Sequence, residues 1–322
     1  MRSFEFLVEN EEAKRKQRVL RALEKKKAED PIFDKTYKLL VGPAISSRIE
    51  NYIAKHEDPD IGAEEMAFLI KTIPDLGNTE EIKEFVERWN SDNSLVNTEE
   101  LIPSSGMSSP ATLISVVDEG IAKELFRKLS IQNFSKSDAG PSEAALAIMS
   151  KDITYAKDGG DLVINGKKIE VKGGGKSAQS GGGRIYNDRR KVDQSIIADV
   201  LKNTPYEGQN FSVVAASGTP LPDDFPKENF IKAVSQAWFG EVKPNLVKTF
   251  GSSDFRKEWN SALFNDYAQA AGHEGILIIG ANNYQYVVNG EQLVNVPQTS
   301  KGMLYYPASR QQRDLGIQVS IG

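Results

Sequence analysis

Hydrophobic residues recur at helical spacing over the first half of the chain. Spacings of three and four residues predict helices over residues 9–28, 33–40, 44–56, 62–72 and 79–91, and again over 113–129. Within 79–91, the residues Ile82, Phe85, Val86 and Trp89 form one apolar face. We therefore expect an all-α region over residues 1–102, and the Pro-, Ser- and Gly-rich stretch 97–112 indicates a linker after it.

Near residue 153 the pattern changes to short runs rich in β-branched residues. A helix that begins at Pro141-Ser142 is followed by strands at 153–156, 161–165 and 167–173, a helix at 188–203 and a strand at 210–216. This αβββαβ order predicts a mixed sheet with helices on both faces, with its core at about residues 140–217 of a second domain, 113–322. The fold class expected is α+β or α/β.

Residues 218–322 indicate a β-rich extension of that domain. Helices are predicted at 228–239 and 254–272, and short strands at 275–280, 284–288, 291–296, 303–306 and 317–321. Asn289-Gly290 predicts a hairpin turn within this extension.

A second Asn-Gly pair, Asn165-Gly166, lies between the strands at 161–165 and 167–173. Such a pair favours a two-residue type I′ turn, which fixes the pairing of the flanking strands. In that register Leu162 faces Ile169 and Asp161 falls opposite Glu170.

Alternation along the second strand places Glu170 and Lys172 on the face that Asp161 shares. Two neighbouring carboxylates repel each other, and a divalent cation between them removes that repulsion. Carboxylate oxygens are the ligands that Mg²⁺ prefers, and we expect Mn²⁺ to substitute for it. The alternative interpretation is an exposed strand face with an ordinary Glu–Lys pair.

The arrangement of Asp161 on one strand and Glu170-Val171-Lys172 on the next resembles the PD-(D/E)XK nuclease superfamily. The family's proline is replaced here by Gly160. The resemblance covers roughly residues 140–217 and its motifs are short. It implies a restriction-endonuclease-like core, with Mg²⁺ held by Asp161, Glu170 and the backbone carbonyl of Val171, and with Lys172 assisting the attacking water.

Two further side chains enter the site by the same resemblance. Glu143, in the first turn of the preceding helix, would complete the metal site directly or through a water, although the helix dipole also favours a carboxylate at that position. Gln194, on the helix at 188–203, corresponds to the polar residue that many members direct into the site.

A glycine-rich stretch, residues 172–184, follows the second of these strands. Gly175-Lys176-Ser177 mimics the end of a phosphate-binding loop, but that motif needs a glycine where Glu170 stands, so we reject it. We expect instead a loop that orders on a DNA backbone. The phosphate contacts predicted there are Lys176, Arg184, Arg189, Arg190 and Lys191.

Composition narrows the class of protein. The 322 residues include no cysteine and two histidines, which argues against disulfides, thiolate zinc sites and His₃ zinc enzymes. The net charge is −5, but residues 1–100 hold 16 basic and 22 acidic residues, which leaves 24 and 23 in the rest. DNA binding needs a positive surface only locally, so this balance is compatible with it.

The expected location is the cytoplasm of a bacterial or phage-infected cell, because cysteine is missing, no apolar run approaches membrane-spanning length and the first residues lack a signal-peptide core. Besides DNA, we expect a second copy of the chain or a protein partner to bind the N-terminal helices. The charged helix at 9–28 suits that docking, or else contacts phosphates itself.

The sequence thus predicts a Mg²⁺-dependent DNA endonuclease, with exonuclease and junction-resolvase activity left open. The alternative is a DNA-binding or assembly protein built on a nuclease fold without turnover, because fold alone does not determine function.

Overall fold

The structure is a computed structural model of the 322-residue chain. It describes residues 59–91, 94–106, 111–132, 134, 140–156, 158–173, 184–185, 193–209, 211–212, 222–280, 283–296, 304–305 and 317–319, with five helical residues between 21 and 29. The helices predicted at 33–40 and 44–56 lie outside these residues, as does most of the helix predicted at 9–28. The part described is a mixed α/β protein.

The described residues from 59 to 101 are mainly helical. They are α4 (Pro59–Thr72), the 3₁₀ turn η1 (Ile73–Asp75), α5 (Thr79–Asn90) and α6 (Thr98–Leu101). Asn78 starts α5 by accepting hydrogen bonds from the backbone of Glu80 and Glu81, and the Glu81 side chain accepts one from the backbone of Asn78 in return. The apolar face predicted for this helix is confirmed, because Ile82, Phe85 and Trp89 are buried.

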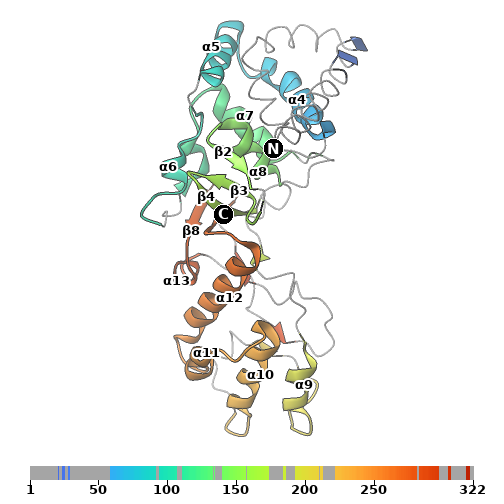
Figure 1. Cartoon of the computed structure of the whole chain (residues 1–322), viewed down its shortest axis with the longest axis vertical. Helices are drawn as coiled ribbons and strands as arrows, with labels where there is room; N and C mark the ends of the chain where they lie inside the picture. Colours follow the sequence, from blue (N-terminus) through green and yellow to red (C-terminus); the bar gives the residue numbers. More distant parts are fainter. Residues whose placement is uncertain are drawn as a thin grey trace, which may run out of the picture.

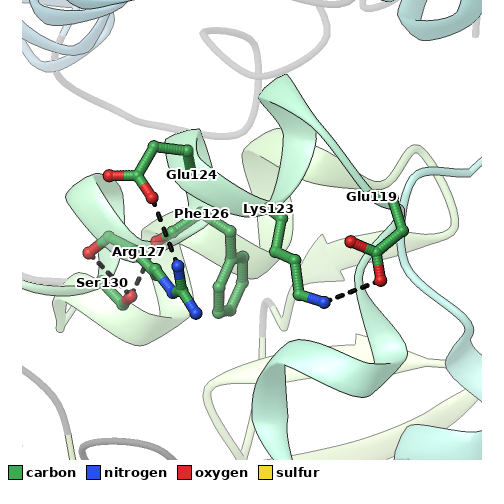
Figure 2. A network of polar contacts seen from close by, with 6 residues as sticks. All are labelled: Glu119, Lys123, Glu124, Phe126, Arg127 and Ser130. Atoms are coloured by element: carbon green, nitrogen blue, oxygen red, sulfur yellow. Dashed lines mark hydrogen bonds and ion pairs between the residues drawn. The ribbon is translucent and has the colours of Figure 1, made fainter. Parts of the chain in front are cut away.

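The helix predicted over 113–129 forms in two pieces. Strand β1 (Ala111–Thr112) and the 3₁₀ turn η2 (Leu113–Val116) precede α7 (Ile121–Ser130). Gly120, the residue before α7, has φ +74°. Few residues other than glycine adopt this conformation, and it interrupts the helical backbone between η2 and α7. Ion pairs and a serine–backbone bond lie along α7 (Figure 2).

The six-stranded sheet has the order β1-β8-β7-β4-β3-β2. Its other members are β2 (Ile153–Tyr155), β3 (Leu162–Ile164), β4 (Lys167–Gly173), β7 (Gly275–Ile279) and β8 (Asn283–Val287). Helix α8 (Pro141–Met149) leads into β2. Strands β2, β3 and β4 pair antiparallel, β7 pairs parallel to β4, and β8 pairs antiparallel to β7.

The prediction that the strand at 210–216 completes the αβββαβ core is wrong. Strand β6 (Phe211–Ser212) pairs with β9 (Leu304–Tyr305) in a separate sheet. The partner of β4 is β7, which the sequence pattern placed in an appendage, and the helix before it is α12 (Phe255–Ala271). The order α8-β2-β3-β4-α12-β7 therefore places residues 174–254 between β4 and α12, and residues 140–217 do not form the core alone.

Two hydrophobic cores lie on the two faces of the sheet. The first joins the helices before residue 102 to α7, α8 and alternate residues of the strands, such as Ile169 and Leu277. The second joins the opposite residues, such as Ile276, to α12 and to α9 (Ser195–Leu201), α10 (Lys227–Phe239) and α11 (Pro244–Thr249). Because the first core extends across residue 102, the predicted boundary between a helical domain and the rest does not separate two cores.

Among the described residues near the end of the chain, one predicted strand is a helix instead. Residues Gly290–Leu293 form a short helix, α13, in place of the strand predicted at 291–296. Asn289 caps it by accepting a hydrogen bond from the backbone of Gln292 at 2.9 Å, so Asn289-Gly290 is a helix start and not a hairpin turn. Strand β10 (Ile317–Gln318) pairs with β5 (Arg184–Ile185).

Among the described residues, no helix is both long enough and apolar enough to cross a membrane.

Candidate metal centre

The hairpin between β3 and β4 has the register that its turn predicts. Asn165 and Gly166 have φ values of +51° and +77°, as a type I′ turn requires, and Leu162 pairs with Ile169. Asp161, one residue before β3, donates its backbone N–H to the carbonyl of Ile169 at 2.9 Å. The turn therefore brings Asp161 beside the middle of β4.

The carboxylate of Asp161 is held by β4 itself. Its Oδ2 accepts a hydrogen bond from the backbone N–H of Val171 at 2.7 Å. Within a strand, the N–H and C=O of one residue point to the same side. The carbonyl of Val171 therefore also faces Asp161, so its oxygen lies near the two carboxylate oxygens of Asp161.

Gly160 has a conformation that explains why no proline precedes Asp161. Its φ is +67°, whereas proline is fixed near −65°. A Cβ at this position would also lie 3.1 Å from the carbonyl oxygen of Ile169. Glycine is therefore what this approach to β4 requires.

Glu170 and Lys172 lie on the face of β4 that α12 covers. Glu170 is buried, and Nζ of Lys172 donates to its Oε1 at 2.5 Å. The hydroxyl group of Tyr267, from α12, donates to the same oxygen, and the Lys172 ammonium lies 4.9 Å from the centroid of the Tyr267 ring. This buried ion pair differs from the exposed Glu–Lys pair of the alternative interpretation.

Helix α8 contributes the third carboxylate. Glu143 is in its first turn and accepts a hydrogen bond from the backbone N–H of Gly140. A Cβ on Gly140 would lie 2.7 Å from Oε1 of Glu143 and 3.9 Å from the carbonyl of Gly173, so the carboxyl group lies beside the end of β4. The helix-start role foreseen for Glu143 and its nearness to the site are thus both present.

The three carboxyl groups interact electrostatically. Burial, followed by the charges of Asp161 and Glu170, raises the pKa of Glu143 to about 8. Burial and the charge of Glu170 raise the pKa of Asp161 to about 6, against the opposing effects of the Val171 N–H and of Lys172. The pKa values of Glu143 and Asp161 stay raised despite the lowering effect of Lys172, so added positive charge is favourable here.

Two residues of this site escaped the sequence interpretation. Tyr267 belongs to α12, and His273 follows that helix, with ring centroids 5.0 Å apart. Burial lowers the pKa of His273 to about 4, and neither of its ring nitrogens has a hydrogen-bond partner among the described residues. The sequence analysis missed them because the pattern does not show that α12 is the helix connecting β4 to its parallel partner, β7.

Gln194 is not brought to this site. It occupies the N-cap position of α9 without a side-chain capping bond, and α9 lies with α10 and α11 at the end of the molecule remote from β3 and β4 (Figure 1). The polar side chain that reaches the site from a helix is Tyr267. Of the predicted DNA contacts, Lys176, Arg189, Arg190 and Lys191 lie outside the described residues, and Arg184 is described only as part of β5.

The donor set suits a hard divalent cation. Asp161, Glu170 and the Val171 carbonyl offer oxygens, which Mg²⁺ and Mn²⁺ prefer, and Glu143 adds another close by. Within the described part of the chain, no three Asp, Glu, His or Cys side chains are already gathered as a ligand cluster. Burial first, and then the neighbouring carboxylate charges, raise the pKa values of Asp161 and Glu143.

No family model, no curated protein and no solved structure matches this chain. The interpretation of the site therefore depends on its geometry.

Proposed function

We propose that this protein is a metal-dependent DNA endonuclease of the PD-(D/E)XK type, which hydrolyses phosphodiester bonds. The observation that carries the proposal is the meeting of Asp161, Glu170 and Lys172 on neighbouring strands, with Glu143 delivered by α8. The order α8-β2-β3-β4-α12-β7, with β7 parallel to β4, supports it as well.

Each residue has a separate part in this proposal. Asp161, Glu170 and the Val171 carbonyl would hold Mg²⁺, and Glu143 would join them directly or through a water. Bound there, the cation would acidify a water and stabilise charge on the phosphate. Lys172 supplies a fixed ammonium group, restrained by Glu170 and Tyr267, that orients the attacking water or stabilises charge on the pentacovalent phosphate.

The test is cleavage of linear, closed circular, single-stranded and four-way-junction DNA with Mg²⁺, Mn²⁺ or EDTA. Wild type is compared with Asp161→Asn and Lys172→Ala. We expect metal-dependent cleavage that both substitutions abolish, and the preferred substrate separates an endonuclease from an exonuclease or a junction resolvase.

Folded wild-type protein that neither cleaves DNA nor binds metal would contradict the proposal. A DNA-binding or assembly role without turnover would then be the better interpretation, and binding of the same DNA substrates in EDTA would test it.

A further inference from the structure

We propose that Tyr267 is a positioning residue for the metal centre: its hydroxyl group fixes Glu170 so that one carboxylate oxygen faces the cation, and its ring holds Lys172. This inference rests on the proposed function and extends it to a residue on α12, a helix far along the chain from β4. Tyr267 is itself 8% exposed, so its ring is packed and its hydroxyl direction is set by the fold.

At Glu170, one carboxylate oxygen accepts the hydrogen bonds of both neighbouring side chains. Tyr267 and Lys172 both donate to Oε1. A carboxylate whose Oε1 already accepts two hydrogen bonds cannot rotate freely, and Oε2 is the oxygen left to face a cation. Residues that hydrogen-bond a metal ligand in this way orient it and change metal affinity by roughly 10- to 100-fold.

The ring of Tyr267 has a second role that its hydroxyl group does not share. The Lys172 ammonium lies 4.9 Å from the ring centroid, within the range of a cation–π interaction. His273 packs against the same ring, and Phe264 packs against His273 with centroids 5.9 Å apart. These contacts fix the ring from the side of α12.

Two substitutions separate the roles. Tyr267→Phe removes the hydroxyl group and keeps the ring, whereas Tyr267→Leu removes both. We expect Tyr267→Phe to weaken Mn²⁺ binding by about tenfold or more, and its DNA cleavage to recover at saturating Mn²⁺. Cleavage by Tyr267→Leu should stay low at saturating Mn²⁺, because Lys172 has lost its support.

The matched control is Tyr284→Phe. Tyr284 is also buried, and its hydroxyl group donates to the backbone carbonyl of Glu100 at 3.0 Å, so the same chemical change is made away from the carboxylates. Mn²⁺ binding is measured by titration calorimetry on the full chain without DNA, and thermal unfolding is recorded for each variant. We expect Tyr284→Phe to bind Mn²⁺ as wild type does.

Wild-type affinity in Tyr267→Phe, or an equal loss of affinity in Tyr284→Phe, would overturn the inference while leaving the proposed function intact. Absence of Mn²⁺ binding in folded wild type would instead overturn the proposed metal centre, and this inference with it. If Tyr267→Phe does not fold, Tyr267→Gln and Tyr267→Met make the same comparison in side chains of similar size. Only glutamine can donate to Glu170, so equal affinities in that pair would also overturn the inference.

Discussion

Oδ2 of Asp161 accepts the backbone N–H of Val171 at 2.7 Å, so the candidate metal ligand on the β3 side is positioned by the strand that carries Glu170 and Lys172. This one contact joins the two halves of the site. It also makes the site sensitive to anything that shifts β4.

Stability should fall as pH rises above about 6.5 in metal-free protein, because below that pH the lowered pKa of the buried His273, about 4, has the opposite effect. The folded-state pKa values of Glu143 and Asp161 are raised to about 8 and about 6, above 4.5 and 3.8, so the folded state retains protons that the unfolded state releases. Their favourable contribution is complete below pH 4 and is lost as pH rises towards 8, by on the order of a few kcal/mol. Urea unfolding at a series of pH values measures it.

Glu143→Gln should flatten that pH dependence above pH 6, because the group that titrates near pH 8 is gone. Glu84→Gln, a change at an exposed glutamate on α5, should leave the dependence as in wild type. A wild-type protein whose stability rises between pH 6.5 and pH 8 would contradict the assignment.

Metal binding should release protons at pH 7. Because the pKa of Glu143 is about 8, its carboxyl group is largely protonated without metal, and a cation favours the ionised form. Calorimetry with Mg²⁺ in buffers of different ionisation enthalpy should show roughly one proton released per ion. Binding enthalpies that are identical in all buffers would exclude this, and Glu143→Gln should release fewer protons than wild type.

Lys172→Ala should lose cleavage and retain metal. The ammonium group is expected to act on the transition state, so its removal should lower kcat by about 10²- to 10³-fold while Mn²⁺ still binds. Lys168→Ala is the control four residues earlier on β4, where Nζ of Lys168 donates to the carbonyl of Asp158 at 2.7 Å. Equal loss of activity in both variants would indicate a general effect of β4 and not a role of Lys172.

Two glycines that flank the site should differ widely in their tolerance of alanine. Gly166→Ala meets no atom within 4 Å and should cost about 1–2 kcal/mol from the positive φ alone. At Gly173 a Cβ would lie 2.0 Å from the carbonyl oxygen of Ile279, so alanine must separate β4 from β7. Urea denaturation should show several-fold greater destabilisation for Gly173→Ala, and similar values for the two variants would contradict the pairing.

Local chemistry made much of the site predictable. The turn at Asn165-Gly166 sets the pairing of β3 with β4 through neighbouring residues only, so the positions of Asp161 and Glu170 followed from the sequence. The helix start at Pro141 likewise placed Glu143. These features depend on backbone preferences within a few residues.

The parallel neighbour of β4 was not predictable by the same means. A run such as Phe211–Ala216 and the run at Gly275–Ile279 both have the composition of strands, and composition does not state which of them pairs with β4. The nearer run predicts the wrong crossover helix, and with it Gln194 in place of Tyr267. The error was one of long-range pairing and not of element type.

The parallel pairing of β4 with β7 has a consequence for how the protein folds. Lys168 and Glu274 are joined by two hydrogen bonds, from the Lys168 N–H to Oε1 of Glu274 and from the Glu274 N–H to the Lys168 carbonyl, across 106 residues of chain. Contacts at such separation form slowly, because a long loop must close before they repay its entropy. Because α12 and β7 follow β4 by about a hundred residues, we expect the contacts of Tyr267 with Glu170 and Lys172 to form after the β3–β4 hairpin that brings Asp161 to β4.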